Sequence, residues 1–328
     1  MPTAAPPLRT SLPIHDRLDG VVPDVERAML EPILADIDRL KRERNAVILA
    51  HNYMTPDIFH GAADLRGDSL ELARLAADTT AEVIVMAGVH FMAETAKILS
   101  PEKTVLIPDQ RAGCSLAASI TGDDVRALKA RHPGVPVVTY VNTSAEVKAE
   151  SDITCTSSNA VRIVESLGTD RVLFLPDQYL ASWVASQTDV EVLAWDGACE
   201  VHERFTGAEL DRLRTTEPGV SIIAHPECPP DVLDASDFVG STSQMTAWVR
   251  DHRPERVVMV TECSMADNVA QESPETDFVR PCNMCPHMKR ITVQNLRTAL
   301  ETMQHPVEVP ADIAERARGA VDAMLRAS

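Results

Sequence analysis

The sequence predicts an α/β fold made of three pseudosymmetric, three-layer αβα domains, each with a parallel sheet. Short, mostly apolar segments of strand length alternate with segments whose apolar residues recur about every 3.6 positions. Strands that are apolar along most of their length are typical of parallel sheets covered by helices on both faces. One series of motifs also occurs three times along the 328 residues. The repeat indicates three domains of one kind.

The expected strands are compact runs rich in β-branched residues. In chain order they are 46–50, 83–87, 104–107, 137–141, 172–175, 190–195, 221–224 and 257–260. The clearest helix signals come from two sets of apolar residues at helical spacing. They are Leu30, Ile33, Leu34, Ile37 and Leu40, and Val161, Ile163, Val164 and Leu167.

The repeat is defined by polar residues that follow the strands. Each copy begins with a polar residue at a strand end (His51, Asn142, His225). A hydroxyl residue follows 18, 15 and 17 positions later (Ser69, Ser157, Thr242). A cysteine comes 45, 42 and 43 positions after that (Cys114, Cys199, Cys285). We therefore expect α/β units at 24–108, 109–195 and 196–304, a flexible leader at 1–23, and a C-terminal helix at 305–328 that packs back on the first unit.

The repeated residues all lie where ligands bind in parallel sheets. Loops beyond the carboxyl ends of the strands carry free polar groups, and the helices that follow present N-terminal N–H groups there. If the three units pack around a pseudo-threefold axis with these ends inward, the three repeat cysteines meet at the centre. Three thiolates make a metal site with one position left open.

The seven cysteines need more than one explanation. A cysteine at a strand end is usually a small buried hydrophobe, and we adopt that interpretation for Cys155, Cys228 and Cys263. Cys282 and Cys285 form a C-x-x-C, which suggests a zinc half-site or a redox pair. Only Cys285 has the repeat phase, so Cys282 is a redox neighbour or a spectator. The spacings do not resemble a disulfide framework, and we expect a cytoplasmic protein with reduced thiols.

The histidines and hydroxyl residues have structural alternatives. His51 or His225 alone would more often be a structural histidine, but their shared repeat position favours a binding role. Ser69, Ser157 and Thr242 could be simple helix N-caps. Capping and anion binding are compatible, because a carboxylate or phosphate docks at the same helix end.

Composition excludes several functions. The chain has 31 basic and 49 acidic side chains and a formal net charge of −18, a poor match to nucleic acid or an anionic membrane surface. Its apolar runs are far shorter than the roughly 20 residues that span a bilayer. The sequence has no G-x-G-x-x-G, Walker A or H-E-x-x-H motif, so nucleotide and zinc-protease sites lack support.

Six motifs together resemble quinolinate synthase. They are ILAHNY at 48–53, GDSL at 67–70, GVHFMAE at 88–94, AGCSLA at 112–117, CTSSNA at 155–160 and CPHMK at 285–289. The resemblance covers about residues 30–305 and implies three α/β domains around a 4Fe-4S cluster. It implies a transferase of NAD biosynthesis that condenses iminoaspartate with dihydroxyacetone phosphate to quinolinate, losing phosphate and two waters. It further implies a functional link to an aspartate oxidase or dehydrogenase that supplies iminoaspartate.

The resemblance also implies roles for particular residues. Three cysteines would hold three irons (Cys114, Cys199, Cys285), leaving the fourth iron open as a Lewis acid rather than an electron carrier. Seven residues match substrate-binding positions (His51, Ser69, Tyr140, Asn142, Ser157, His225, Thr242). Glu227, beside His225, is the expected general base if burial raises its pKa. Tyr53 is a second candidate, as a proton donor, and His202 is a candidate because it lies near Cys199 in the sequence. His225 is also a catalytic candidate, and His202 and Glu227 are expected to bind substrate as well.

Departures from the family are Met54, where a glutamine or aromatic residue is common, and the Cys282/Cys285 pair. Two alternative functions remain. One is a hydro-lyase of another hydroxy acid with the same open iron, which would need no phosphate site. The other is a non-enzymatic iron–sulfur or thiol redox sensor, for which the surplus cysteines are the best argument.

Overall fold

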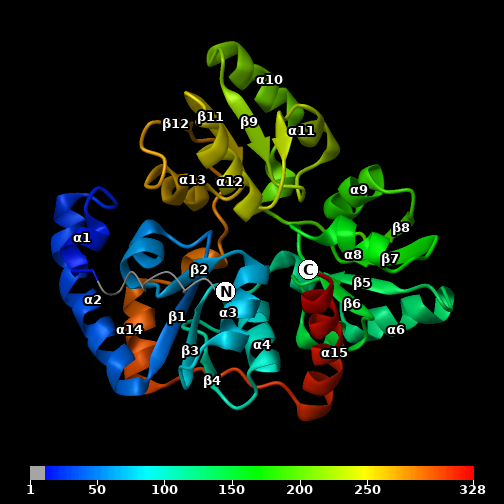
Figure 1. The fold of residues 1–328 in the computed structure, drawn as a ribbon, viewed down its shortest axis with the longest axis horizontal. Coiled ribbons are helices and arrows are strands. Elements are labelled where there is room, and N and C mark those ends of the chain that lie inside the picture. Colours follow the sequence, from blue (N-terminus) through cyan, green and yellow to red (C-terminus); the bar gives the residue numbers. More distant parts are fainter. Residues whose placement is uncertain (1–11) are drawn as a thin grey trace, which may run out of the picture.

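The computed structural model describes residues 12–328 and contains three four-stranded parallel sheets flanked by helices (Figure 1). The strand orders are β2-β1-β3-β4, β6-β5-β7-β8 and β10-β9-β11-β12, so each sheet has the same topology. Figure 1 shows the first sheet (blue and cyan) beside the second (green), with the third (yellow) opposite both. The predicted α/β fold of three αβα domains is confirmed.

The strands have the following bounds. The first sheet holds β1 (Ala46–His51), β2 (Leu65–Gly67), β3 (Val83–Ala87) and β4 (Thr104–Leu106). The second holds β5 (Val137–Tyr140), β6 (Ile153–Cys155), β7 (Arg171–Leu175) and β8 (Glu191–Ala194). The third holds β9 (Ser221–Ala224), β10 (Phe238–Val239), β11 (Arg256–Val260) and β12 (Asp277–Val279). The sequence missed β2, β6, β10 and β12, which are edge strands of two or three residues; a strand this short was detected only for β4, which lies within the apolar run 104–107.

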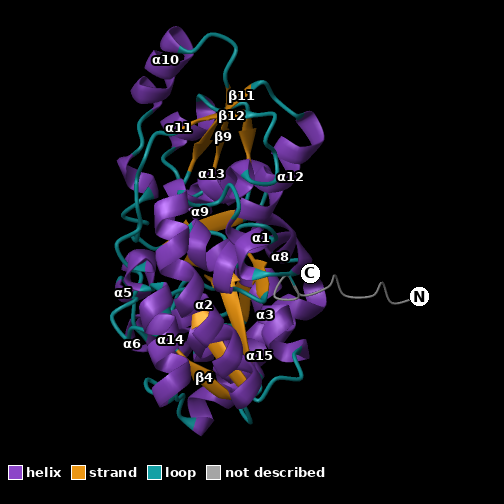
Figure 2. Cartoon of the chain, turned by 90° about the vertical axis from the view of Figure 1, so that its left-hand side faces the viewer, coloured by secondary structure: helices purple, strands orange, loops and turns teal. Residues whose placement is uncertain are grey.

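The longer helices are α2 (Asp24–Arg44), α3 (Ser69–Asp78), α4 (His90–Leu99), α6 (Gly122–Arg131), α9 (Gln178–Gln187), α10 (Gly207–Thr216), α12 (Thr242–His252), α14 (Val293–Thr302) and α15 (Ala311–Ala327). The shorter ones are α1 (Ile14–Leu18), η2 (Asp57–Ala62), α5 (Ser115–Ala118), α7 (Ala145–Ala149), α8 (Ala160–Ser166), η3 (His202–Arg204), α11 (Pro230–Asp234), α13 (Cys263–Ala270) and η4 (Met288–Arg290). Both predicted amphipathic helices are present, as α2 and α8. Seen from the side, the third unit forms one end of the molecule with α10 outermost (Figure 2).

The expected flexible leader needs correction where the structure describes it. Residues 14–18 form α1, and Leu18 is completely buried against the first core. Arg17 is also buried, donates to the carbonyl of Gly61 at 2.7 Å and pairs with Asp38. Helix α1 therefore packs on the first unit, because Leu18 adds apolar surface to its core. Residues 1–11 lie outside the described residues.

The last two helices do not pack on the units to which the sequence assigns them. Helix α14 lies within the range expected for the third unit but packs on α2 and β3 of the first. Helix α15 contacts α4 of the first unit, but also α7, α8 and β6 of the second. It therefore bridges two units rather than packing on the first alone. We keep 24–108, 109–195 and 196–304 as the proposed limits of the repeating units.

Two further observations concern Met54 and the lengths of the helices. Met54, where the chain departs from the resembled family, is 1% exposed and packs in the first core. In the described part of the chain, every helix is too short or too polar to cross a bilayer.

Candidate functional site

One cavity collects every residue that the sequence singled out for binding, catalysis or metal ligation. It encloses about 710 Å³, counting the space open to solvent at its mouth. The predicted residues in its wall are His51, Tyr53, Ser69, Cys114, Tyr140, Asn142, Ser157, Cys199, His202, His225, Glu227, Thr242 and Cys285. Because β1, β5 and β9 end beside this cavity, the polar residues at their carboxyl ends face one another there.

His51 and His225 have matching environments. The ring Nδ1 of each lies close to the backbone N–H two residues further on, 3.2 Å from Tyr53 and 3.4 Å from Glu227. Burial lowers the pKa of His51 to about 4 and that of His225 to about 3. Both rings are therefore neutral at pH 7, and a ring whose Nδ1 accepts a bond carries its proton on Nε2. His225 Nε2 lies 3.2 Å from Ser157 Oγ, so it donates to that hydroxyl.

Asn142 holds the corresponding position after β5. Its Oδ1 is buried and has no hydrogen-bond partner within residues 12–328. A buried carbonyl oxygen without a partner costs free energy unless a ligand or water satisfies it. Asn142 therefore offers the cavity an acceptor that the described protein groups do not use.

The N-cap alternative is wrong for the three hydroxyl residues. Asp68 caps α3 and Ser241 caps α12, which places Ser69 and Thr242 at the first helical position. Asn159 precedes α8, and Ser157 instead receives the bond from His225. The hydroxyls of Ser69 and Thr242 therefore do not cap their helices. They lie beside the N-terminal backbone N–H groups of these helices, which favour anions.

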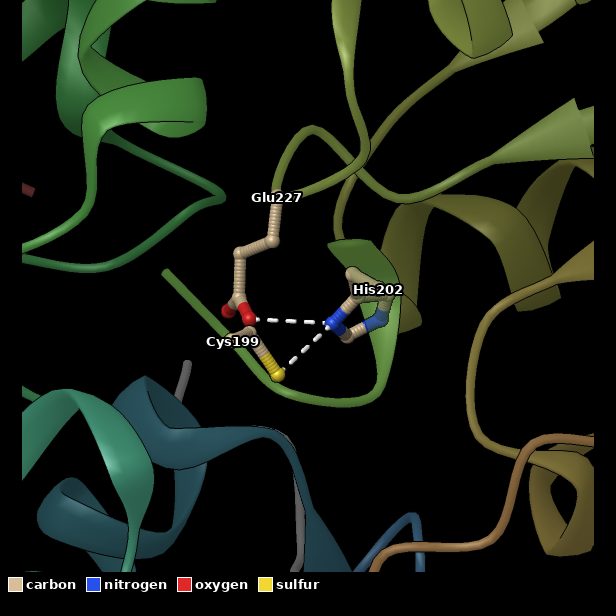
Figure 3. Close-up of side chains that lie close together, drawn as sticks. All are labelled: Cys199, His202 and Glu227. Carbon is tan, nitrogen blue, oxygen red and sulfur yellow. Dashed lines mark hydrogen bonds and ion pairs between the residues drawn. The ribbon is translucent and has the colours of Figure 1, made fainter. Parts of the chain in front are cut away.

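Glu227 lies at the centre of a buried hydrogen-bond chain (Figure 3). His202 Nδ1 is 3.0 Å from Glu227 Oε2 and 3.1 Å from Cys199 Sγ. On the other side, the hydroxyl of Tyr140 donates to Glu227 Oε1 at 2.5 Å. The chain continues from His202 Nε2 to the hydroxyl of Thr261 at 2.9 Å, and from there to the hydroxyl of Tyr53 at 2.6 Å.

The expected rise in the pKa of Glu227 is wrong. Burial by itself raises this pKa, but the attraction of His202 and His225 and hydrogen bonds from His202 and Tyr140 outweigh it. The net pKa lies below the ordinary glutamate range, so Glu227 is an ionised carboxylate. Burial and the charge of Glu227 also raise the pKa of Tyr53 and Tyr140 well above 10, so both phenols keep their protons, and Tyr140 donates its proton to Glu227.

The three repeat cysteines share one local geometry. Each lies near the backbone N–H groups two and three residues further on, and these hydrogen bonds favour the thiolate. The donors are Leu116 and Ala117, Val201 and His202, and His287 and Met288. Burial outweighs them and raises the pKa of all three thiols, that of Cys114 to about 12. A cationic group is therefore needed to hold these cysteines as thiolates.

The donor set fits an iron–sulfur cluster. Three half-buried cysteines in one cavity are the ligand type that such clusters use, and the N–H groups beside them are the hydrogen-bond donors that surround the sulfurs of such clusters. A second set, Cys199, His202 and Glu227, has ligand atoms within 4.8 Å of one another. Its members already bond to each other through His202 Nδ1, so that nitrogen serves as a hydrogen-bond donor there.

Of the three cysteines expected to be buried core thiols, two are found as such and Cys263 is not. Cys155 and Cys228 are completely buried free thiols, as predicted. Cys263 is not a core thiol, because it forms a disulfide with Cys282 across a Cα–Cα distance of 5.1 Å. The bridge between Glu262 and Asn283 brings the two segments side by side, although they are 19 residues apart. Cys282 is therefore paired with Cys263 and leaves Cys285 free.

Several cavity residues were missed by the sequence reasoning. They are Asp68, Phe91, Met92, Ser115, Glu200, Glu262 and His287. Most sit inside or next to the motifs quoted above, so proximity to a motif was the available signal. Glu262 lay outside every motif. Its Oε1 pairs with Lys289 at 2.7 Å and accepts from the backbone N–H of Cys285 at 3.3 Å.

A buried lysine near the cavity, Lys148, predicts how the stability of the protein changes with pH. Lys148 is completely buried, donates to the carbonyl of Thr143 and lies 5.4 Å from the ring centre of Phe91. Burial lowers its pKa from 10.5 to about 8, against the opposing charges of Glu94 and Cys114. Between these two values the unfolded chain binds more protons than the native protein, so the free energy of unfolding rises with pH.

We expect this rise to be absent from Lys148→Met. Relative to that variant, the wild-type protein should gain about 3 kcal/mol in free energy of unfolding between pH 7.5 and 10.5. Urea unfolding of both proteins across this range measures the difference. A difference that stays constant with pH would show that Lys148 titrates normally in the native state.

Comparisons with known proteins extend over nearly the whole chain. A family model described as "Quinolinate synthetase A protein" matches residues 35–326. "Quinolinate synthase 1" of Mesorhizobium japonicum is 62% identical over 318 residues, which are 97% of this chain and 98% of that protein. "Quinolinate synthase" of Agrobacterium fabrum is 61% identical over 313 residues, 95% of this chain and 91% of that protein. "Quinolinate synthase" of Xylella fastidiosa is 59% identical over 307 residues, with coverage of 94% and 91%.

Proposed function

The chain belongs to the quinolinate synthase family, and from this premise we propose that it condenses iminoaspartate with dihydroxyacetone phosphate, releasing phosphate and two waters. The observation that carries the proposal is that one cavity combines three cysteines with neutral donors suited to small anions. The proposed reaction makes the protein a transferase of NAD biosynthesis. We further propose a cytoplasmic location, where an aspartate oxidase or dehydrogenase would supply iminoaspartate.

Anion binding is proposed for the donors around the cavity. His51 presents a neutral ring with Nε2 protonated, and Ser69 and Thr242 stand at the starts of α3 and α12. Because the whole chain carries a net charge of −18, these local donors have to supply the attraction for two anionic substrates. Asn142 and Ser157 complete the proposed set with an amide and a hydroxyl.

Cys114, Cys199 and Cys285 would hold a 4Fe-4S cluster through three of its irons. When bound, such a cluster supplies a Lewis-acidic iron that can polarise a substrate oxygen. The backbone N–H groups that follow each cysteine would stabilise the thiolates.

Proton transfer is proposed for the chain of residues around Glu227. As an ionised carboxylate, Glu227 can accept a proton from substrate carbon or nitrogen, and its low pKa favours handing that proton on. His202 Nδ1 lies 3.0 Å from this carboxylate and would donate a hydrogen bond that orients it, with His225 stacked on the His202 ring at 4.8 Å. Tyr53 keeps its phenolic proton and would donate it to a departing oxygen.

The decisive experiment is anaerobic reconstitution with iron and sulfide, followed by an absorption spectrum, iron and sulfide counts, and a quinolinate assay. We expect four irons per chain and quinolinate only when iminoaspartate and dihydroxyacetone phosphate are both present. A hydro-lyase of another hydroxy acid would instead turn over without the phosphate ester. A redox sensor would take up the cluster and form no quinolinate, which would refute the proposal.

Substitution of Ser69 separates binding from capping. Because Asp68 provides the cap, Ser69→Ala should leave the melting temperature unchanged and raise KM by about tenfold, the effect of losing one hydrogen bond to a charged ligand. The matched variant Asp68→Ala should lower stability by about 1 kcal/mol through the lost cap. Steady-state kinetics and thermal unfolding measure the two effects. A lower melting temperature with normal KM in Ser69→Ala would assign the hydroxyl to the helix.

A further inference from the structure

We infer that Ser115, Glu200 and His287 form a belt that ties the three cysteine loops together and keeps the cysteine site assembled. The inference rests on the proposed cluster site, but the belt consists of contacts already present between protein groups. Ser115 and Glu200 directly follow Cys114 and Cys199, and His287 comes two residues after Cys285. All three line the cavity.

The first connection joins the loops of Cys114 and Cys199. The hydroxyl of Ser115 donates to the carbonyl of Ala198 at 3.1 Å. The same oxygen accepts the backbone N–H of Glu200, also at 3.1 Å. One side chain of the first loop thus holds the backbone on both sides of Cys199.

The second connection joins the loops of Cys199 and Cys285. Glu200 Oε1 lies 2.9 Å from His287 Nε2, within hydrogen-bond distance. His287 Nδ1 is buried and has no hydrogen-bond partner in the described range 12–328, so the polar contact of the ring in that range is the one between Nε2 and the Glu200 carboxylate.

The third connection closes the ring of contacts. A β-carbon added at Gly113 would lie 3.5 Å from His287 Nδ1 and 3.7 Å from its Cε1, so the imidazole packs directly against the backbone beside Cys114. Each cysteine loop therefore contacts the other two through a residue adjacent or nearly adjacent to its cysteine.

The belt lies where the site meets solvent. The side chains of His287 and Glu200 are 28% and 30% exposed, while they also face the cavity. Partly exposed contacts contribute little to global stability, but they can set the local spacing of the loops. A metal site needs its ligands held in position by such surrounding contacts, and losing them lowers metal retention rather than folding.

The test uses Glu200→Ala, His287→Ala, the double variant and Ser115→Ala. In the apoprotein, we expect a thiol reagent to modify Cys114, Cys199 and Cys285 about tenfold faster than in wild type, measured site by site by mass spectrometry. In the reconstituted protein, we expect the brown absorbance to decay about tenfold faster under an iron chelator. Glu203→Ala is the matched control, an exposed glutamate three residues from Glu200, and should behave as wild type.

Two comparisons make the test specific. The double variant should lose its cluster no faster than His287→Ala, because that single change already breaks the contact with Glu200. Glu200→Gln keeps an acceptor for His287 and should recover most of the wild-type rate. Unchanged thiol labelling and cluster decay in all variants, or multiplicative effects in the double variant, would overturn the belt.

Failure of the belt remains distinct from failure of the proposed function. If wild-type protein takes up no cluster, the proposed cofactor is wrong, while thiol labelling of the apoprotein still decides about the belt. Ser115→Ala removes a single hydroxyl, so it should fold and still test the belt if the Glu200 or His287 variants fail to fold. Matching circular dichroism spectra and melting temperatures would assign faster labelling to the loops.

Discussion

Alanine at Cys114, Cys199 or Cys285 is expected to abolish both the brown iron–sulfur chromophore and quinolinate formation. Each cysteine lines the one cavity, and each provides one of three sulfurs in a donor set that has no spare cysteine. Without one of these sulfurs the site would offer only two cysteines, whose thiol pKa is raised by desolvation and which would hold a cluster poorly. The absorption spectrum and iron and sulfide counts after anaerobic reconstitution measure the loss.

The remaining cysteines provide the controls. Cys155→Ala removes a completely buried thiol of the second sheet and should retain the cluster. Cys282→Ala breaks the disulfide with Cys263 and should also retain it, because neither sulfur lines the cavity. A protein that loses the cluster with Cys282→Ala but keeps it with Cys285→Ala would show that the ligand assignment is wrong.

Glu227→Gln is expected to keep the cluster and to lower turnover by about 10²–10⁴-fold, the usual contribution of a group that transfers protons. The amide has nearly the same shape as the carboxylate, so packing against Tyr140 and His202 should persist. It cannot accept a proton at neutral pH, and it removes the negative charge that faces His202. The measurements are kcat and the iron content of the same preparations.

The matched control for Glu227 is Glu203→Gln, the same change at an exposed glutamate near η3. This variant should retain normal turnover and a normal cluster. Near-normal turnover in Glu227→Gln would remove Glu227 as the base and direct attention to His225 or Tyr53. Loss of the cluster in Glu227→Gln would instead assign Glu227 to holding the cysteine site through His202 and Cys199.

Much of the fold could be predicted because its determinants are local. The central strands β1, β5 and β9 are apolar runs of four to six residues, and α2 and α8 have clear helical periodicity. The edge strands β2, β6, β10 and β12 were missed, since two or three residues outside a longer apolar run carry no detectable pattern. The positions of α14 and α15 also could not be predicted, because an amphipathic helix can cover any sheet with a complementary face.

The candidate site, like the fold, could be predicted only in part. The spacing of three cysteines, two histidines and three hydroxyl residues identified its members, because a repeat places equivalent residues at equivalent strand ends. The lowered pKa of Glu227 could not be predicted, since His202 and Tyr140 come from other parts of the chain. The position of Ser69 was also left open by the sequence, and the structure shows that the preceding residue, Asp68, provides the N-cap of α3.

The sequence by itself determined the fold class, the threefold repeat and the repeated polar residues and cysteines of the cavity wall, because periodicity and spacing are properties of the chain. Only the tertiary structure decided which groups face one another: Cys263 with Cys282, Glu227 with His202, and Glu200 with His287. These pairs join segments that are separated along the chain and that meet only when the third unit has folded. Charge, protonation and hydrogen bonding depend on such neighbours over a few ångströms, whereas secondary structure depends mainly on neighbours along the chain.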